Sequence, residues 1–392
     1  MKKAFLFLIA LAGLFSCSKV TIERPESGFI ASAAFEGTGQ RGYPGGHAGI
    51  LSAGEWNDLE HWGLWSSLMS NPNFLEMAEF WGVNTSRRVA VRVADADGKR
   101  LPNVKVELKQ GQAGTIWSTV TDNLGEASLW VDPFHAEAGT EDLAIVIDGV
   151  PQSGAPKVTT WNVQQEGADV NFYQITGARE PQKKADLAFI VDATGSMGDE
   201  IAFLKKDLMN ILDRVKGGQG DIGLRTGTVF YRDEGDDYVT KYSQFTDDYR
   251  ETIQYIAMQN AQGGGDHPEA VHTALSAALQ NLDWNASARS RIAFLILDAP
   301  AHQDHQGVIE SLQKSLEYYA KYGIKIIPVF CSSPTKECEF MCRDFAILTG
   351  GTYVFLTDDS GVGGPHLQAS VGEYQTEHLN DLLVRLIAKY IG

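Results

Sequence analysis

Residues 186–199 read Asp-Leu-Ala-Phe-Ile-Val-Asp-Ala-Thr-Gly-Ser-Met-Gly-Asp, a short apolar run followed by a loop rich in oxygen-bearing side chains. The apolar run predicts a buried strand, and Asp192, Thr194 and Ser196 come directly after it at alternate positions. One carboxylate and two hydroxyls at the carboxyl end of a buried strand are oxygen ligands of the kind that Mg²⁺ prefers. The stretch therefore predicts both an α/β sheet and a cation site at the edge of that sheet.

The sequence around this stretch alternates apolar strand patterns with amphipathic helix patterns. The expected strands are residues 186–191, 223–231, 238–245, 291–297, 324–330 and 352–356. The helices expected between and after them are residues 199–215, 249–258, 268–282, 307–322, 338–348 and 373–390. Strands that are apolar on both faces and separated by helices are typical of a doubly wound sheet. We therefore predict an α/β domain over residues 184–392, with a mostly parallel sheet of those six strands.

Two later loops carry further oxygen ligands at the predicted ends of strands. Residues 263–270 read Gly-Gly-Gly-Asp-His-Pro-Glu-Ala, and residues 295–300 read Leu-Ile-Leu-Asp-Ala-Pro, which places Asp298 after a strand. With the loop from Asp192 to Ser196, they resemble the metal-ion-dependent adhesion site of the von Willebrand factor A domain, in its hemicentin-like and bacterial branch. The resemblance covers about residues 184–392. Thr194 stands where many members have serine, and Asp266 stands where integrin-type domains supply a threonine.

This resemblance implies that Asp192, Thr194, Ser196, Asp266 and Asp298 hold Mg²⁺, or Mn²⁺ or Ca²⁺ in its place. The chemistry of the residues agrees, because the two hydroxyls can bind an ion directly while the aspartates hold coordinated waters. Mg²⁺ demands a near-octahedral shell and retains waters, so one position stays open for a carboxylate from a partner. We interpret the metal as a bridge to a ligand rather than as a catalyst.

Some acidic and histidine side chains near these loops have two interpretations. Asp266 is either a ligand or the N-cap of a helix that has Glu269 at its third position. Three residues that follow Asp298 closely, His302, Asp304 and His305, either line the rim of the site or face solvent, as exposed histidines after a strand usually do. The turn after the second predicted strand holds Asp233, Glu234, Asp236 and Asp237. It is by default a solvated acidic turn, and the alternative is a second cation site there, with Asp233 at the rim.

Three cysteines, Cys331, Cys338 and Cys342, lie in the last quarter of the chain. In an exported protein disulfides persist, so a bridge between two of the three is the simplest expectation. The alternative, a zinc site, lacks the second CxxC pair or paired-histidine motif that zinc sites usually show.

The residues before the α/β domain predict a separate β-rich part. Alternation with a period of two and Asp-Gly and Asn-x-Gly turns over residues 87–178 predict an antiparallel β-sandwich, with one strand at residues 158–163. This part resembles the carboxypeptidase-regulatory-like or bacterial Ig-like modules, which implies a spacer or adhesive role. Residues 51–86 carry an aromatic stripe at helical spacing. We expect short helices there, beginning near residues 52–55 and packed on a neighbouring domain, with an exposed ligand platform as the alternative.

The first residues predict where the protein acts. Residues 1–17 hold two lysines, an apolar run and Leu-Phe-Ser-Cys, a pattern typical of a bacterial lipoprotein signal that leaves a lipidated Cys17. An ordinary cleaved signal with an incidental cysteine is the alternative. Residues 18–50 are glycine-rich and predict a tether. The net charge of −17 argues against binding to nucleic acid, which needs clustered Lys and Arg.

These features predict a lipoprotein of the bacterial cell envelope, anchored by its lipid to the outer membrane or cell surface. Its A domain would bind a protein or glycan ligand, through an acidic side chain, by way of a divalent cation. An α/β phosphohydrolase that uses Asp192 as nucleophile is one alternative. Such enzymes have a second carboxylate two residues after the nucleophile, and this chain has Thr194 at that position. An accessory subunit of an envelope assembly is another alternative. We expect a binding protein and not an enzyme.

Overall fold

The structure is a computed structural model that describes residues 51–135, 139–177, 181–265, 267–332, 335–360, 366 and 368–392. The predicted signal peptide with Cys17, the predicted tether and Asp266 lie outside the described residues. Among the described residues, no helix is long and apolar enough to cross a membrane.

The larger sheet has eight strands in the order β11-β10-β9-β12-β13-β14-β1-β15. Its five central strands are parallel neighbours, and β11, β1 and β15 are antiparallel to theirs. The six strands expected from the sequence are all present, but the predicted number was too low because β1 and β15 extend the sheet beyond β14. In spatial order the strands are β11 (Thr240–Thr246), β10 (Gly223–Tyr231), β9 (Gln182–Asp192), β12 (Ala288–Leu297), β13 (Ile324–Phe330), β14 (Tyr353–Thr357), β1 (Ser52–Trp56) and β15 (Glu377–His378).

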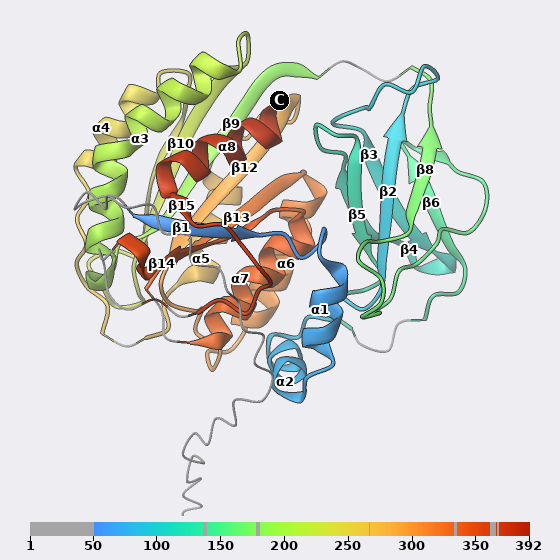
Figure 1. Ribbon diagram of the computed structural model, residues 1–392, viewed down its shortest axis with the longest axis horizontal. Coiled ribbons are helices and arrows are strands. Elements are labelled where there is room, and N and C mark those ends of the chain that lie inside the picture. The colour runs from blue at the N-terminus through green and yellow to red at the C-terminus, as the bar shows by residue number, and fades with distance from the viewer. Residues whose placement is uncertain are drawn as a thin grey trace, which may run out of the picture. The chain divides into compact units, whose positions relative to one another are not determined.

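Helices cover both faces of this sheet (Figure 1). The face that receives Leu187 and Phe189 of β9 is covered by α3 (Gly198–Gly218), α4 (Tyr249–Ala257) and α8 (Leu379–Ile391). The other face, which receives Ile190, is covered by α5 (Val271–Asn281), α6 (Val308–Lys321) and α7 (Lys336–Thr349). Successive side chains of a strand point to opposite faces, so a strand covered on both sides reads as a continuous apolar run. The predicted doubly wound α/β architecture is therefore present.

The strand β1 corrects the expectation for residues 51–86. Residues 52–55 were expected to begin a helix, but they form a strand that pairs with β14 on one side and with β15 on the other. The expected short helices follow as α1 (Trp62–Met69) and α2 (Pro72–Trp81). Trp62 and Trp65 are fully buried, and the Trp65 ring stacks on Phe340 of α7 at 5.6 Å. These aromatic side chains are packing surface rather than an exposed platform.

Two smaller sheets form the β-rich part of the chain. One has the order β5 (Glu126–Trp130), β2 (Arg88–Ala94), β8 (Val170–Gln174), and the other has the order β4 (Gly114–Val120), β3 (Lys105–Gln110), β6 (Leu143–Ile147), β7 (Val150–Pro151). Val91 of the first sheet and Leu108 of the second belong to one buried cluster. The pairing is not wholly antiparallel as expected, because β8 runs parallel to β2. Residues 158–163 do not form the expected strand and contribute only a bridge between Thr159 and Arg88.

The three cysteines of the α/β part are free and buried, which corrects the expected disulfide. Cys338 and Cys342 lie one turn apart on α7, and Cys331 follows the last residue of β13. Burial raises the pKa of both Cys331 and Cys338, so these thiols stay protonated within the core.

Candidate cation site

The candidate site lies where β9 and β12 end. These parallel strands are neighbours, and Ile296 lies opposite Val191, so Asp192 and Asp298 emerge at the same edge. The chain crosses from β9 to β10 on one side and reaches β12 on the other, which makes this edge a switch point of the sheet. Ligands of open α/β sheets bind at such points, outside the carboxyl ends of the strands.

Asp192 and Thr194 form the buried floor of the site. Oδ1 of Asp192 accepts hydrogen bonds from the backbone N–H and from the hydroxyl of Thr194, both at 2.8 Å. Oδ2 of Asp192 is buried and has no partner within hydrogen-bond geometry among the described residues, although the buried hydroxyl of Tyr231 is near enough to oppose the rise in its pKa. Burial, followed by the nearby Asp298 carboxylate, raises the pKa of Asp192 to about 7. An orphaned carboxylate oxygen of this kind is costly unless something positive approaches it.

Ser196 and Asp298 are the other two described residues of the site, and they interact with each other. Ser196 is exposed in a single turn of 3₁₀ helix, Gly195–Met197, which precedes α3. Asp298 is buried, and its burial raises the pKa of the carboxyl, while interaction with the Ser196 hydroxyl opposes that rise. The structure thus brings together Asp192, Thr194, Ser196 and Asp298 as the sequence predicted.

The glycine loop before α5 packs directly on this floor. The backbone N–H of Gly195 donates to the carbonyl of Gly263 at 3.1 Å. Gly264 has φ of +73°, and a Cβ there would lie 3.1 Å from Cβ of Thr194. The backbone N–H of Gly264 donates to Oδ2 of Asp236 at 2.9 Å. Glycine is therefore required at this position both for its backbone conformation and for the close approach.

The position of α5 corrects one interpretation of Asp266. The helix begins at Val271 with Ala270 as its N-cap, and no side chain caps it. The expected helix start at residue 268, with Asp266 as N-cap and Glu269 at the third position, is therefore wrong. The other interpretation, of Asp266 as a ligand, falls on a residue outside those described and stays a prediction.

Glu269 is a site residue that the sequence analysis missed. Its side chain is 3% exposed, and its Oε2 has no partner among the described residues. Burial, followed by the charge of Asp192, raises the pKa of Glu269 to about 9. Its backbone is held by a hydrogen bond from its N–H to the carbonyl of Pro300 at 2.8 Å, beside Asp298 in sequence. The sequence around Glu269 carries no signal that distinguishes a buried site residue from an exposed glutamate in the first turn of a helix.

The rim contains an arrangement of histidines. His302 is buried and pairs through Nε2 with Oδ1 of Asp233, which follows β10. The ring of His305 stacks on that of His302, with centroids 4.2 Å apart. The expectation that these histidines face solvent is thus wrong for His302, and Asp233 is likewise buried rather than part of a solvated turn.

The donor set fits a hard divalent cation. The ligands available are carboxylate and hydroxyl oxygens, and the buried orphan oxygen of Asp192 points to a positive ligand. Asp192, Thr194, Ser196 and Asp298 are the described residues that would hold such an ion. Several buried carboxyls with raised pKa values show that the surroundings lack compensating positive charge.

Comparison with known proteins agrees with this geometry. Residues 186–327 match the family description of the von Willebrand factor A domain. The chain therefore contains a von Willebrand factor A domain over these residues, which confirms that resemblance. The hemicentin-like branch and the Ig-like nature of the smaller sheets stay predictions.

Relatives of known sequence are similar over the same part. An ariadne-like RING finger protein of Acanthamoeba polyphaga mimivirus is 33% identical over 121 residues, which are 31% of this chain and 12% of that protein. An alpha-protein kinase of Dictyostelium discoideum is 30% identical over 119 residues, which are 30% of this chain and 19% of that protein. Because the matches span under a fifth of each relative, they concern one domain and not the activities in the relatives' names.

Among solved structures, two of proximal thread matrix protein 1 from the mussel byssus, one of them in its crystal form 2, are similar to part of this chain. One is 13% identical, covers 44% of this chain and 46% of its own, and the other is 15% identical and covers 40% and 39%. The TM-score of 0.30 in both cases is too low to support an argument.

Proposed function

We propose that this chain is a membrane-anchored, extracytoplasmic binding protein. Its von Willebrand factor A domain, which suggests an interaction or adhesion module, would bind an acidic group of a protein or glycan ligand through Mg²⁺, with Mn²⁺ or Ca²⁺ as substitutes. The lipid anchor at Cys17 would hold it at the outer membrane or surface of a bacterial cell.

One observation carries the metal-dependent part of this proposal. Asp192 places a charge-bearing oxygen, Oδ2, in a buried position without a partner among the described residues, beside Thr194 and Asp298. Unpaired buried carboxylates destabilise a fold, and a cation that binds there removes this cost.

Two kinds of oxygen ligand would hold such an ion. Thr194 and Ser196 offer neutral hydroxyl oxygens, and Asp192 and Asp298 offer negative ones, directly or through water. When bound, Mg²⁺ would supply an open coordination position with residual positive charge for a partner's carboxylate. The Gly263–Gly264 loop holds Thr194 in place by its close contact.

The test is metal binding by the mature full-length chain. Titration calorimetry should show one Mg²⁺ or Mn²⁺ per chain, and millimolar Mg²⁺ should raise the melting temperature, since an ion that binds only the native state stabilises it. Asp192→Asn and Asp298→Asn should remove most of that gain, whereas Asp97→Asn, an exposed aspartate in the turn after β2, should behave like wild type.

Two results would contradict the proposal. Titration of wild type without heat or stabilisation at millimolar Mg²⁺ and Mn²⁺ would exclude the cation site. Hydrolysis of a phosphate ester that Asp192→Asn abolishes would replace the binding function by catalysis.

The anchor is tested separately. Cys17→Ser removes the residue that would carry the acyl chains, and without them we expect the protein to leave the membrane pellet for the soluble fraction. A Ser18→Cys/Cys17→Ser variant, which moves the thiol by one residue, should also be released. Retention of Cys17→Ser in the pellet would show that something other than a lipid at Cys17 holds the protein.

A further inference from the structure

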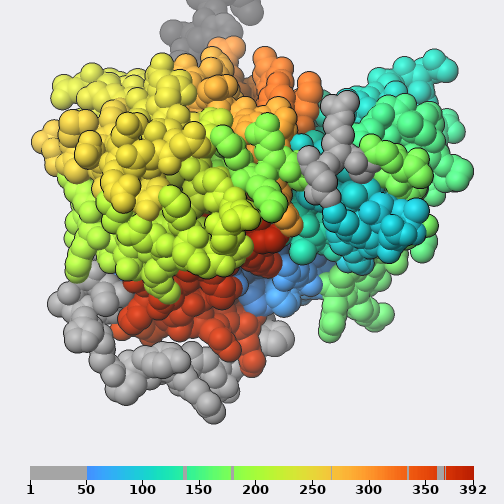
Figure 2. Space-filling view, turned by 90° about the horizontal axis from the view of Figure 1, so that it is seen from above, coloured from blue at the N-terminus to red at the C-terminus, as the bar shows by residue number. Residues whose placement is uncertain are grey.

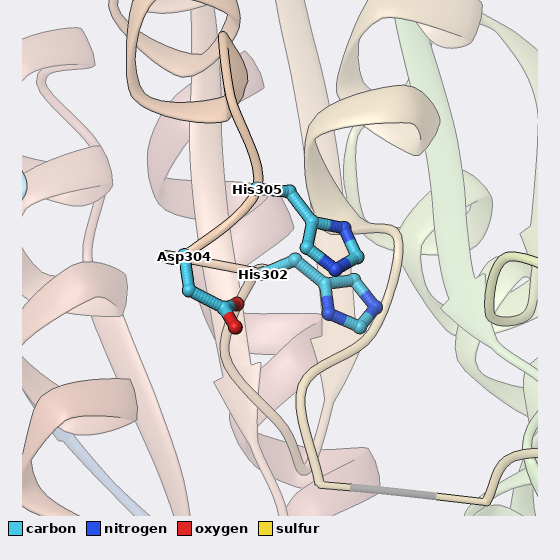
Figure 3. Close-up of side chains that lie close together, drawn as sticks. All are labelled: His302, Asp304 and His305. Atoms are coloured by element: carbon cyan, nitrogen blue, oxygen red, sulfur yellow. The ribbon is translucent and has the colours of Figure 1, made fainter. Parts of the chain in front are cut away.

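A second cluster of metal-ligating side chains lies in the loop between β12 and α6. One ligand atom each from His302, Asp304 and His305 lies within 4.8 Å of the others. Figure 3 shows the carboxylate of Asp304 directed toward the His302 ring, with the His305 ring above. From the sequence, all three residues were expected either at the rim of the Asp192 site or in solvent, and not as ligands of an ion of their own.

Both imidazoles have one nitrogen directed at a carboxylate from the turn after β10. Nε2 of His302 pairs with Oδ1 of Asp233 in a short contact. Nδ1 of His305 lies 3.6 Å from Oε2 of Glu234. This leaves Nδ1 of His302 and Nε2 of His305 without those partners. Histidines that bind metals commonly direct their other nitrogen at a carboxylate, which fixes the tautomer and raises the basicity of the ligating nitrogen.

The cluster is partly built before any ion binds. His302 is 3% exposed and held by Asp233, so its ring is fixed. The ring of His305 is stacked parallel to it, with centroids 4.2 Å apart, so the in-plane lone pairs of the two rings do not yet converge on one point. Asp304 and His305 are exposed, so their side chains can move. Tetrahedral ligands at zinc distances are separated by about 3.3 Å, so closure needs the exposed His305 ring to rotate out of the stack and Asp304 to move by about an ångström.

We propose that His302, Asp304 and His305 bind a divalent first-row transition metal of the zinc type. Two imidazole nitrogens and one carboxylate oxygen suit Zn²⁺ and disfavour Mg²⁺, which prefers oxygen alone. The three protein ligands leave one position for water or a partner's side chain, because the cluster opens to solvent on the side of Asp304 and His305. Asp233 is a positioning residue, since it acts on the metal through His302.

The exposed pair His135 and Asp132 provides an internal comparison. Its imidazole Nδ1 lies 2.7 Å from the aspartate, which resembles the contact of His302 with Asp233, but the histidine side chain is 79% exposed. Among the described residues, the grouping of three ligands occurs only at residues 302–305. A histidine beside a carboxylate is therefore not by itself a site, and His135→Ala is a suitable control.

The experiment is a titration of the mature full-length chain with Zn²⁺ and with Co²⁺ in millimolar Mg²⁺, which saturates an oxygen site. We expect one saturable Zn²⁺ per chain by calorimetry and an intense visible absorption from four-coordinate Co²⁺. His305→Ala and Asp304→Ala, both at exposed positions, should weaken binding at least tenfold and abolish the absorption. Asp233→Asn should weaken binding by about 10-fold to 100-fold while keeping the Co²⁺ spectrum.

The controls separate this site from the Asp192 site. His135→Ala and Asp192→Asn should both bind Zn²⁺ like wild type, and the second of these would lose only the Mg²⁺ effect. Zn²⁺ binding that is absent, that survives both His305→Ala and Asp304→Ala, or that is lost in His135→Ala would overturn the proposal.

Discussion

Buried carboxyl groups gather at the carboxyl edge of the larger sheet. Asp192, Glu200, Glu269 and Asp298 are at most 6% exposed, and burial is the first cause of the raised pKa of each. In each case except Asp298, a neighbouring carboxylate is a further cause. At this scale the chain holds carboxyl groups whose ionisation is unfavourable unless a cation lies beside them, and ionising them without a cation lowers stability.

Glu200 allows this cost to be measured apart from the proposed ligands. It lies in the first turn of α3, and burial, then Asp298, raises the pKa of its carboxyl to about 7. Between about pH 4.5 and pH 7 the native state holds a proton that the unfolded chain has lost, so the free energy of unfolding falls as the pH rises through this window. Glu200→Gln should therefore lie within about 1 kcal/mol of wild type at pH 5 and exceed it by about 3 kcal/mol at pH 8.

Urea unfolding in a chelator at both pH values measures the difference. Glu337→Gln, at an exposed glutamate in the first turn of α7, is the matched control and should show no such change between the two pH values. An equal difference between Glu200→Gln and wild type at pH 5 and pH 8 would show that the Glu200 carboxyl is ionised in the native state over the whole range.

The contact of Gly264 with Thr194 makes a second prediction at this scale. In Gly264→Ala the new methyl group meets Thr194 and Oε1 of Glu269 at 3.1 Å, and the positive φ of +73° strains any side chain, so the loop or Thr194 must shift by a few tenths of an ångström. We expect Mg²⁺ affinity to fall about 10-fold, equivalent to about 1.4 kcal/mol. Gly149→Ala has a similar positive φ, +81°, with nothing within 4 Å, and should cost stability alone. Calorimetry that finds equal Mg²⁺ affinities in the two variants would show that this contact does not position Thr194.

The positions of Asp192 and Asp298 could be predicted from the sequence, whereas those of the residues around them could not. Asp192 and Asp298 each follow a continuous apolar run, so their place at the sheet edge is a local property of the sequence. The burial of Glu269 and the pairing of His302 with Asp233 depend on where distant loops meet, and local pattern does not encode that. For the same reason the sequence contains no sign that Oδ2 of Asp192 lacks a partner.

At the scale of elements, β1 shows where prediction from sequence stops. The central strands could be recognised because helices cover both their faces and demand apolar runs. Residues 52–56 read Ser-Ala-Gly-Glu-Trp, which carries no strand pattern. They form a strand because β14, about 300 residues later, offers an edge. Gly54 is needed there, since a Cβ would lie 2.7 Å from the rings of Phe355 and Tyr374.

The segment after β1 is tied to α7 by a buried ion pair. Arg343 donates to both carboxylate oxygens of Asp58, at 2.5 and 2.9 Å, and both side chains are at most 1% exposed. Asp58→Ala leaves the buried guanidinium with less compensation, and we expect a loss of about 3–5 kcal/mol in the free energy of unfolding. Urea denaturation measures this loss.

An exposed pair supplies the control for Asp58. Arg214 and Asp381 link α3 to α8 at 2.8 Å, with side chains 40% and 45% exposed. Asp381→Ala should cost less than about 1 kcal/mol, because solvent screens the pair. A loss as small as this in Asp58→Ala would mean that Glu339, which lies 3.5 Å from Arg343, compensates the guanidinium alone.

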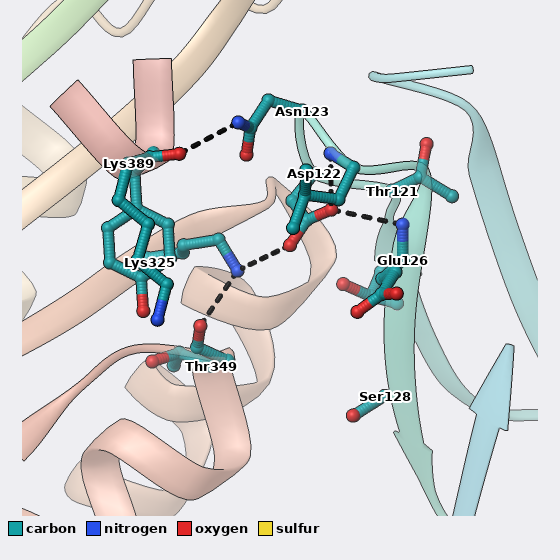
Figure 4. Close-up of polar contacts among 12 residues, drawn as sticks. Thr121, Asp122, Asn123, Glu126, Ser128, Lys325, Thr349 and Lys389 are labelled. Carbon is teal, nitrogen blue, oxygen red and sulfur yellow. Dashed lines mark hydrogen bonds and ion pairs between the residues drawn. The ribbon is translucent and has the colours of Figure 1, made fainter. Parts of the chain in front are cut away.

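At the scale of the whole molecule, the two smaller sheets contact the α/β part at β12, β13 and the end of α8. Lys325 of β13 lies 3.3 Å from Asp122 in the turn before β5 (Figure 4). Nη2 of Arg291 donates to Oδ1 of Asn103 at 2.7 Å. Figure 2 shows the C-terminal residues beside the strands of the smaller sheets. A polar cavity of about 290 Å³, lined by Arg88, Glu126 and Lys389 among others, lies between the smaller sheets and the α/β part.

Asn123, in the turn before β5, links the smaller sheets to the end of α8. Its side-chain N–H groups donate to the carbonyl of Lys389 at 2.8 Å and to that of Gly392 at 3.2 Å, so a turn of the smaller sheets caps the last turn of the helix (Figure 4). The last carbonyls of a helix have no partner within it, and a donor from elsewhere stops the end from fraying. The smaller sheets therefore stabilise an element of the domain that carries the cation site.

Removal of this cap tests whether the two parts are energetically coupled. Asn123→Ala should lower the free energy of unfolding by about 1–2 kcal/mol and speed hydrogen exchange in the last turn of α8. Exchange in β9 should stay as slow as in wild type. Asn162→Ala, at an exposed asparagine whose Oδ1 accepts only from the local N–H of Gln164 at 3.0 Å, should leave exchange in α8 unchanged. If exchange in α8 is the same in Asn123→Ala and wild type, the helix end is held by its own packing, since Leu386, Ile387 and Ile391 are fully buried.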